Sequence, residues 1–199
     1  MSNVENFRPR SGYLLAFTAY FAISSFSYVN ILDYGFQGGL PSIVWGLWLC
    51  ALLYLIFIHP KVIFSDEGVV IINPMKKITI GWQEISEIDA RFTMYVDHLP
   101  TGVRYHAFAA QAPGRYHSRN IHPNEVKGLR IGDSGMIRAG ESPRSNSGAA
   151  TAIARARQEN FRKSGHLTGL NFAIAVNKSG LLIITALLTL ALVIQFFHA

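Results

Sequence analysis

Residues 41–58 read PSIVWGLWLCALLYLIFI and contain no charged side chain. Ten of them are Leu, Ile, Val or Phe, and at about −0.3 to −0.6 kcal/mol each these ten favour membrane insertion by roughly 3 to 6 kcal/mol. A helix of this length matches a hydrocarbon core about 30 Å thick. We therefore predict a transmembrane helix over residues 40–58. The alternative is a helix buried in the core of a globular protein.

Two further apolar segments accompany this one. Residues 181–197, LLIITALLTLALVIQFF, include twelve Leu, Ile, Val or Phe residues and predict a span over residues 179–197. Residues 13–32 are apolar but contain several Ser, Thr and Asn residues. Because Arg8 and Arg10 precede this segment, a secretory signal peptide is the rival interpretation. No A-x-A-like cleavage site follows, and the next span begins after the short loop 33–39, so we predict a helical hairpin.

The basic residues predict the orientation of these spans. Arg8 and Arg10 precede the first span, loop 33–39 has no Lys or Arg, and the other 16 of the 18 basic residues lie between residues 59 and 178. Basic residues are enriched on the cytoplasmic side of membrane proteins. We therefore expect a multi-pass protein of the cell membrane, of the bacterial inner membrane type. Residues 1–12 and the long central segment would be cytoplasmic, and the C-terminus would lie outside.

Residues 59–130 have the pattern of a β-rich domain. Short runs such as KVIFS, VVII and KKITIGW are separated by turn signals at residues 66–68 and 73–74. Short strands with close connections indicate an antiparallel meander and argue against βαβ units. Alternation of polar and apolar residues predicts the core positions. These are Ile78, Ile80, Trp82, Ile85 and Ile88.

A Gly-, Ser- and Arg-rich linker over residues 131–146 separates this domain from a predicted basic helix over residues 147–164. Ser147 is the expected N-cap, and Gly165 is placed to end the helix. A basic helix beside a bilayer could contact anionic headgroups, whereas a solvated helix face is the commoner explanation. The candidate membrane-surface contacts are Lys61, Arg155, Arg162, Lys163 and Lys178.

Three strings carry a resemblance to a known family: HPKVIFSDEGVVIINPMKKITIGWQEI, RFTMYV and AFAAQAPGR. They resemble the bacterial pleckstrin-homology-like (PH-like) domain of small actinobacterial membrane proteins. The later string SGAATAIARARQEN, followed by GHL, is similar to their downstream segment, and two leading spans with one trailing span match their layout. The resemblance implies a split barrel of two antiparallel β-sheets closed by a C-terminal helix. It names no reaction, because the family largely lacks an assigned biochemical function.

One departure from pleckstrin-homology domains concerns their lipid ligand. Domains that bind phosphoinositides usually place basic residues around the first β-turn, which here is the acidic string SDEG at residues 65–68. The two carboxylates would repel a phosphorylated headgroup. Lys76 and Lys77 on the next turn are a weaker substitute. We therefore do not expect phosphoinositide binding.

No motif predicts catalysis or a cofactor. The string GDSG at residues 132–135 resembles the nucleophile region of serine proteases, but it lies in the linker without the surrounding double barrel. The spacing of His98, His106, His117 and His122 matches no zinc signature, and the single Cys50 excludes a disulfide within the chain. We therefore expect no metal and no cofactor. We also expect no nucleic-acid partner, since a membrane setting explains the formal net charge of +6.

Several Arg and Tyr residues between positions 104 and 119 suggest where a protein partner would bind, because both types are enriched in interfaces. This candidate partner surface comprises Arg104, Tyr105, Arg115, Tyr116 and Arg119. We predict a non-catalytic, membrane-anchored interaction or scaffold module facing the cytoplasm. The alternative is an accessory subunit of a larger membrane complex, such as a transporter, that acts through its transmembrane helices. An enzyme acting on lipid is a third possibility.

Overall fold

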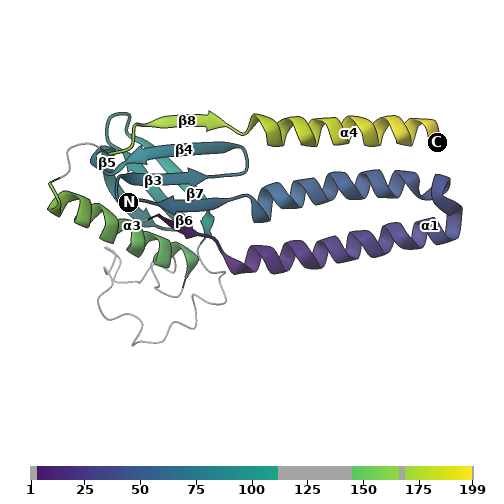
Figure 1. The fold of residues 1–199 in the computed structure, drawn as a ribbon, viewed down its shortest axis with the longest axis horizontal. Coiled ribbons are helices and arrows are strands. Elements are labelled where there is room, and N and C mark those ends of the chain that lie inside the picture. The colour runs from purple at the N-terminus through teal and green to yellow at the C-terminus, as the bar shows by residue number, and fades with distance from the viewer. Residues whose placement is uncertain (1–3, 112–144, 166–168, 199) are drawn as a thin grey trace. The chain divides into compact units, whose positions relative to one another are not determined.

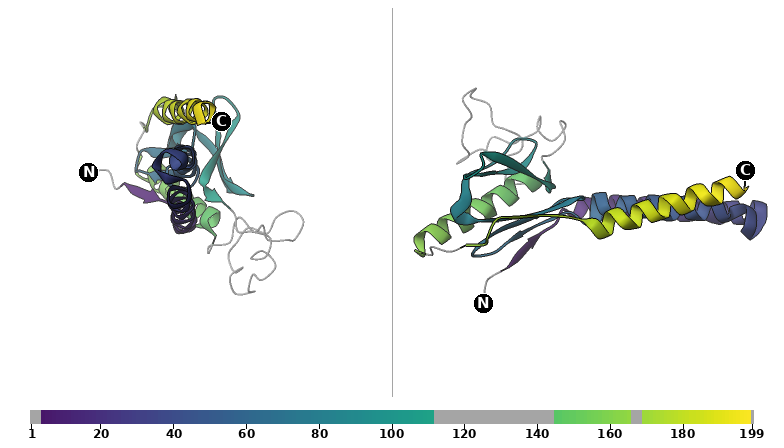
Figure 2. Two further views of the ribbon diagram at one scale, coloured as in Figure 1. Left: turned by 90° about the vertical axis from the view of Figure 1, so that its right-hand side faces the viewer. Right: turned by 90° about the horizontal axis from the view of Figure 1, so that it is seen from above.

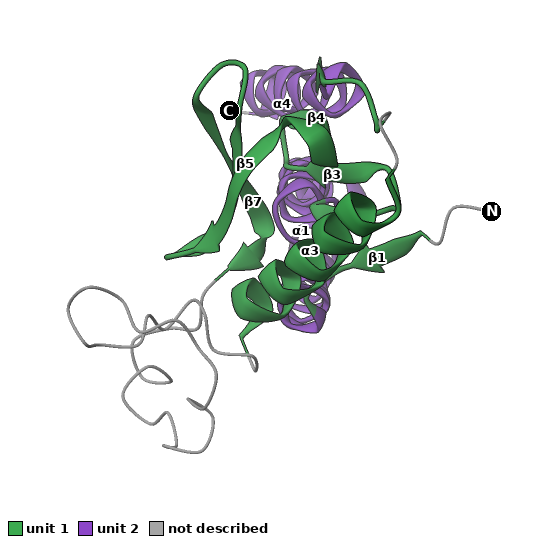
Figure 3. Cartoon of the chain, turned by 90° about the vertical axis from the view of Figure 1, so that its left-hand side faces the viewer, with its two compact units in different colours: residues 1–9, 60–175 green, residues 10–59, 176–199 purple. Residues whose placement is uncertain are grey.

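The computed structural model describes residues 4–111, 145–165 and 169–198, and it divides the chain into two compact units (Figure 3). Unit 1 comprises residues 1–9 and 60–175, and unit 2 comprises residues 10–59 and 176–199. The fold class is α+β: unit 1 contains antiparallel sheets, and unit 2 contains two helices long and apolar enough to cross a membrane.

Unit 1 contains one five-stranded sheet, which we call sheet A (Figure 1). In order across the sheet, its strands are β1 (Glu5–Phe7), β2 (Lys61–Phe64), β3 (Gly68–Ile72), β4 (Lys76–Gly81) and β8 (Ala173–Val176). Strands β1 to β4 pair antiparallel with their neighbours. The predicted turns at residues 66–68 and 73–74 connect β2 to β3 and β3 to β4 and are confirmed. The edge strands β1 and β8 have no counterpart among the elements predicted from the sequence.

A second, three-stranded antiparallel sheet, sheet B, follows the 3-10 turn η2 (Trp82–Glu84). Its strands are β5 (Ile85–Ala90), β6 (Thr93–His98) and β7 (Val103–Gln111). The tight β6–β7 connection includes Gly102 at φ 65°, a backbone angle that glycine adopts without steric cost. Sheet B therefore matches the meander predicted for the second half of the β-rich segment.

The core of unit 1 lies between the two sheets and helix α3 (Asn146–Lys163). The predicted core residues Ile78, Ile80, Trp82, Ile85 and Ile88 are all buried, at 5% exposure or less. Sheet A also contributes Val62, Phe64, Val69 and Ile71, sheet B contributes Met94, Val96, Ala107, Ala109 and Ala110, and α3 contributes Ala150, Ala154 and Phe161. The small residues of α3 allow its backbone to approach the sheets closely.

Helix α3 begins one residue earlier than predicted, and its N-cap differs from the prediction. The hydroxyl of Ser145 accepts a hydrogen bond of 2.8 Å from the amide of Gly148, which satisfies one of the free amides at a helix start. Ser147, the predicted cap, is instead fully buried in the first turn. The predicted stop is confirmed, because the helix ends at Lys163 and Gly165 has a positive φ of 68°.

Unit 2 is built from α1 (Arg10–Leu53), the π-helical turn η1 (Tyr54–Ile58) that extends it, and α4 (Lys178–His198). Helix α1 reverses direction at Gly35, whose φ of 70° and ψ of 176° are not helical. We call the segments before and after Gly35 its first and second arms. Figure 2 shows α1 and α4 end-on. The prediction of a loop over residues 33–39 is wrong in detail, because the chain is helical on both sides of Gly35 and reverses at this residue.

The two arms of α1 pack closely against each other. The Tyr20 hydroxyl donates to the carbonyl oxygen of Cys50 at 3.3 Å, and the Ser27 hydroxyl donates to that of Ser42 at 3.2 Å. A Cβ placed on Gly46 would lie 2.9 Å from Cγ2 of Ile23 on the first arm, so a larger residue at position 46 requires the Ile23 side chain to shift. Small residues with cross-helix hydrogen bonds are typical of helices packed in membranes.

Candidate functional site

Arg104 and Tyr105 do not form one surface. They are consecutive in β7, and side chains of consecutive strand residues point to opposite faces of a sheet. Arg104 is exposed on the outer face of sheet B, whereas Tyr105 packs against the core of unit 1. The prediction that both belong to one partner surface is therefore wrong. The remaining predicted members, Arg115, Tyr116 and Arg119, lie outside the described residues.

The outer face of sheet B is organised around Arg104. Its guanidinium donates two hydrogen bonds of 2.8 Å to the carboxylate of Asp97 on β6, and it lies 3.7 Å from the centre of the Tyr95 ring. The hydrogen bonds to Asp97 raise the pKa of Arg104 above its ordinary value. Because its charge is neutralised by a bidentate partner, Arg104 is poorly suited to bind a free phosphate group.

A second ion pair lies on the same face of sheet B. Arg155 of α3 donates from Nη2 to Oδ1 of Asp89 at 3.1 Å, and the Tyr95 hydroxyl donates to Oδ2 of Asp89 at 3.2 Å. Asp89 is only 6% exposed. Burial and the neighbouring Asp89 carboxylate raise the pKa of Tyr95 above its ordinary value, since both disfavour a phenolate.

Two of the four histidines noted in the sequence are described, and they lie on opposite faces of sheet B. His106 is exposed, and its Nδ1 lies 3.0 Å from the Thr93 hydroxyl. His98 is buried and stacks on Phe172, with ring centres 4.0 Å apart. His117, His122 and the GDSG string lie outside the described residues. Among the residues that the structure describes, no group of three His, Cys, Asp or Glu side chains is placed to hold a metal ion.

The predicted membrane-surface contacts have different surroundings. Arg155 is occupied by its ion pair with Asp89, and Lys163 pairs with Glu159 at 2.8 Å on the surface of α3. The hydrogen bond from Lys163 lowers the pKa of Glu159. Arg162 is exposed beside Glu159, whose pKa its charge also lowers. Lys61 is half-buried at the start of β2, while Lys178 is the first residue of α4.

The acidic β2–β3 turn is partly neutralised. Arg157 of α3 lies 2.6 Å from Oδ1 of Asp66 and 3.5 Å from Oε2 of Glu5. This bridge ties the helix, the β2–β3 turn and the edge strand β1 together within unit 1. Arg157 was predicted only as part of a basic helix, because its two acidic partners lie far away in the sequence. The carboxylate of Glu67 remains exposed beside Asp66.

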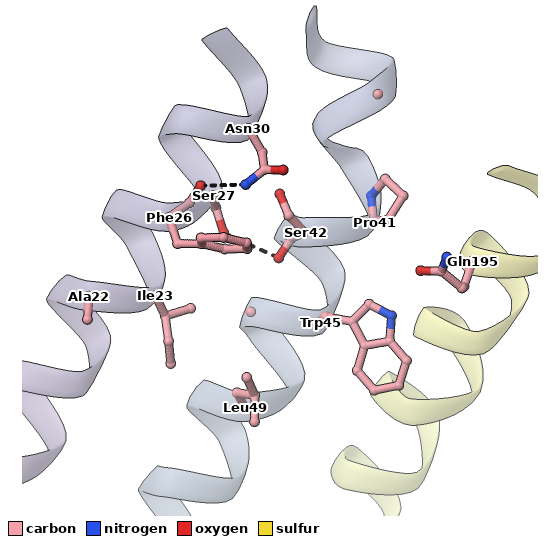
Figure 4. A pocket seen from close by; sticks show the side chains of 12 residues that line it. Ala22, Ile23, Phe26, Ser27, Asn30, Pro41, Ser42, Trp45, Leu49 and Gln195 are labelled. Atoms are coloured by element: carbon pink, nitrogen blue, oxygen red, sulfur yellow. Dashed lines mark hydrogen bonds between the residues drawn. The ribbon is translucent and has the colours of Figure 1, made fainter. Parts of the chain in front are cut away.

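Unit 2 contains a groove of about 600 Å³ along the two arms of α1 and the end of α4 (Figure 4). Its polar lining includes Ser27, Asn30, Ser42 and Gln195, and Trp45 forms part of its apolar wall. Ser27, Asn30 and Ser42 donate to backbone carbonyl oxygens within α1. Among the described residues, the Gln195 amide has no hydrogen-bond partner, so a polar group remains available at the groove.

No family model, curated protein or solved structure matches this chain. The fold and these sites define an α+β chain that has one two-sheet unit and one helical unit compatible with a membrane.

Proposed function

We propose that this chain is a non-catalytic interaction module held in the membrane by three spans. The first two spans are the arms of α1, and the third is α4. The observation that carries this proposal is the pairing of β1 with β2 in one sheet, with Phe7 opposite Val62. Strand β1 precedes α1 and β2 follows it. Both must therefore lie on the same side of any membrane that α1 enters.

An even number of crossings between residues 10 and 59 satisfies this constraint. A single crossing would place β1 and β2 on opposite sides and break the pairing. The reversal at Gly35 and the hydrogen bonds between the two arms support two crossings. This argument is independent of the distribution of Lys and Arg, which favours a cytoplasmic location for unit 1. Helix α4 then crosses once and takes the C-terminus outside.

Cysteine labelling tests this topology. In a Cys50→Ser background, cysteine would replace Gln37 near the reversal of α1 or Glu67 in the β2–β3 turn, both of which are exposed. We expect an impermeant maleimide to label position 37 from outside intact cells, and to label position 67 only after permeabilisation. Labelling of position 67 in intact cells, or of both positions alike, would refute the proposal.

Within unit 1, two packed antiparallel sheets and α3 support assignment to the PH-like split-barrel class. We assign partner binding to the outer face of sheet B. This face contains an exposed Arg104 stacked on Tyr95, and Arg and Tyr often contribute strongly to protein interfaces. Its pairs Arg104–Asp97 and Arg155–Asp89 balance their own charges. The partner is therefore better matched by a mixed protein surface than by an anionic headgroup.

A photo-crosslinking residue tests this assignment. Glu87 is exposed on β5 and lies opposite Asp97, so a crosslinker there samples the outer face of sheet B. Exposed Glu159 on α3 is the matched control. We expect discrete protein adducts from position 87 in native membranes and none of the same mass from position 159. Identical adducts from both positions, or none from position 87, would refute the assignment.

A second candidate function is an accessory subunit that acts through its spans. The groove with its unbonded Gln195 amide favours it, because polar groups at membrane depth usually serve packing or transport. Replacing Gln195 with Leu separates the two candidates. Loss of a co-purifying membrane complex with unchanged adducts at position 87 would favour the accessory subunit. An intact complex would favour the interaction module.

A further inference from the structure

We infer that the β3–β4 turn of unit 1, residues 73–77, is a membrane-surface contact that takes anionic lipid headgroups. This inference rests on the proposed anchoring in the membrane and adds a contact that the sequence did not predict. It depends on where the turn lies in sheet A, on its composition and charge, and on the hydrogen bonds that hold it in place.

The strand register places the turn at the end of sheet A where the chain passes to and from α1. Phe7, the last residue of β1, is opposite Val62, while Lys61 is opposite Ile72, and Ile72 is opposite Lys77. Two strand spacings of roughly 4.8 Å therefore separate Lys61 from Lys77. Lys61 follows Ile58, the last residue of η1, by three positions, a chain length of at most about 10 Å.

This position limits how far the turn can be from a bilayer. If the second arm of α1 ends at the membrane surface near Ile58, Lys77 lies within roughly 20 Å of that point by chain reach and strand spacing alone. A lysine side chain covers several ångströms more, and its apolar stem lets the ammonium reach a charged surface. The lysines of the turn are therefore within reach of the headgroup layer.

The composition of the turn suits an anionic lipid surface. Met75 is 44% exposed, and both Lys76 and Lys77 are exposed. No ion pair joins either lysine to a residue that the structure describes. At the opposite end of sheet A, the β2–β3 turn contains Asp66 and Glu67 instead. Sheet A is thus polarised, with its positive end where the chain passes to and from α1.

The turn is held in place before any lipid binds. The side-chain amide of Asn73 donates to the carbonyl oxygen of His106 at 2.8 Å, and its Oδ1 accepts from the amide of Phe108 at 2.9 Å. The Asn73 backbone amide also donates to the carbonyl oxygen of Lys76 at 2.8 Å. Because β7 fixes the turn in this way, little conformational entropy remains to be lost on contact with a surface.

Anionic headgroups fit this turn better than a protein does. A protein interface needs a buried apolar centre, whereas the turn exposes one Met beside two lysines. Each lysine close to an anionic leaflet strengthens association by roughly fivefold. Since the chain is already anchored, the lysines would determine how closely unit 1 approaches the surface.

Fluorescence quenching in reconstituted vesicles tests the inference. The full chain with Cys50→Ser and Met75→Cys is labelled with an environment-sensitive dye, and Cys50→Ser with Glu67→Cys is the control. Vesicles contain phosphatidylcholine alone or equal parts of phosphatidylcholine and phosphatidylglycerol, each with a trace of headgroup-quencher lipid. We expect quenching at position 75 to exceed that at position 67, to rise with phosphatidylglycerol, and to fall with added salt.

A lysine variant and flotation make the result decisive. Lys76→Gln with Lys77→Gln should remove the phosphatidylglycerol dependence at position 75 without changing the melting temperature, because both side chains are exposed. Equal quenching at positions 75 and 67 would overturn the inference. Protection at position 75 in native membranes but not in pure lipid would overturn it too and assign the turn to a protein. A chain that fails to float with vesicles after a carbonate wash would refute the anchoring instead.

Discussion

Arg155 and Asp89, 66 residues apart in the chain, form an ion pair of 3.1 Å that joins α3 to the edge of sheet B. The same guanidinium donates from Nε to the carbonyl oxygen of Ile88 at 2.9 Å, and Gln158 donates to that of Ile85 at 3.0 Å. Side chains of α3 thus satisfy the outward carbonyl groups of edge strand β5. This covers an edge that would otherwise be open to pairing with another chain.

We predict that Arg155→Ala destabilises unit 1 by about 2 kcal/mol, because it leaves a buried carboxylate without its cation. The apparent melting temperature of the full chain in mild detergent should fall by roughly 10 °C. Arg162→Ala is the matched control, since Arg162 is an exposed arginine on the same helix. Equal melting temperatures for the two variants would show that Arg155 is an ordinary surface residue.

Arg155 also shows where the sequence was insufficient. Its position in a basic helix suggested contact with headgroups, because a linear pattern does not reveal a partner 66 residues earlier. The prediction that Arg104 and Tyr105 share one surface was wrong for a local reason: consecutive residues of a strand point to opposite faces of the sheet. By contrast, the alternation of Ile78, Ile80 and Trp82 predicted the core correctly, because burial of one sheet face imposes that period.

The two edge strands were missed for different physical reasons. Strand β1 has only the three residues Glu5–Phe7, too few to show a period of two. Strand β8, Ala173–Val176, is exposed at every position, so burial imposes no alternation on it. Both strands form by pairing with distant partners in sheet A. The reversal at Gly35 was also missed. A few residues between two apolar spans predict a short loop, whereas the chain is helical on both sides of Gly35.

We predict that Tyr95 makes the stability of unit 1 fall as pH rises in the alkaline range. Its pKa is raised in the folded chain, mainly by burial and then by Asp89, so folding favours the neutral phenol. This contribution is fully present below the unfolded pKa of about 10 and is lost as pH rises through the folded value. We expect the melting temperature to fall above about pH 10, and to fall less steeply in Tyr95→Phe.

The comparison between pH 8 and pH 11 isolates this effect. At the lower pH, Tyr95→Phe also lacks the hydrogen bond to Asp89 and should melt slightly below the natural chain. At the higher pH the difference should shrink or reverse. Parallel loss of stability in both proteins would show that another group controls the alkaline transition.

Gly68, at the start of β3, is required by close approach of the backbone. It lies opposite Gly81 of β4, and a Cβ at this position would run into the carbonyl oxygen of Ile80. We predict that Gly68→Ala lowers the stability of unit 1 by about 1 to 3 kcal/mol, as overpacking in a core does. Thermal unfolding in mild detergent measures the loss.

Glu67→Ala is the matched control for this change. Glu67 precedes Gly68 in the same turn, and its side chain is exposed, so its removal should leave the melting temperature nearly unchanged. If Gly68→Ala were as stable as Glu67→Ala, strand β3 would not approach β4 as closely as its register requires.

The contact between Ser27 and Gly46 defines how the two arms of α1 pack. A Cβ on Gly46 would lie 3.3 Å from the Ser27 hydroxyl oxygen, which brings the two β-carbons near the separation of about 3.5 to 4.5 Å found in disulfides. In a Cys50→Ser background, Ser27→Cys with Gly46→Cys should therefore oxidise readily in membranes. Protection from maleimide–polyethylene glycol, reversed by a reductant, measures the bond.

Ser25→Cys with Gly46→Cys is the control, because exposed Ser25 lies about 200° around the helix from Ser27. Oxidation of the control alone, or of neither pair, would show that the arms pack in another register.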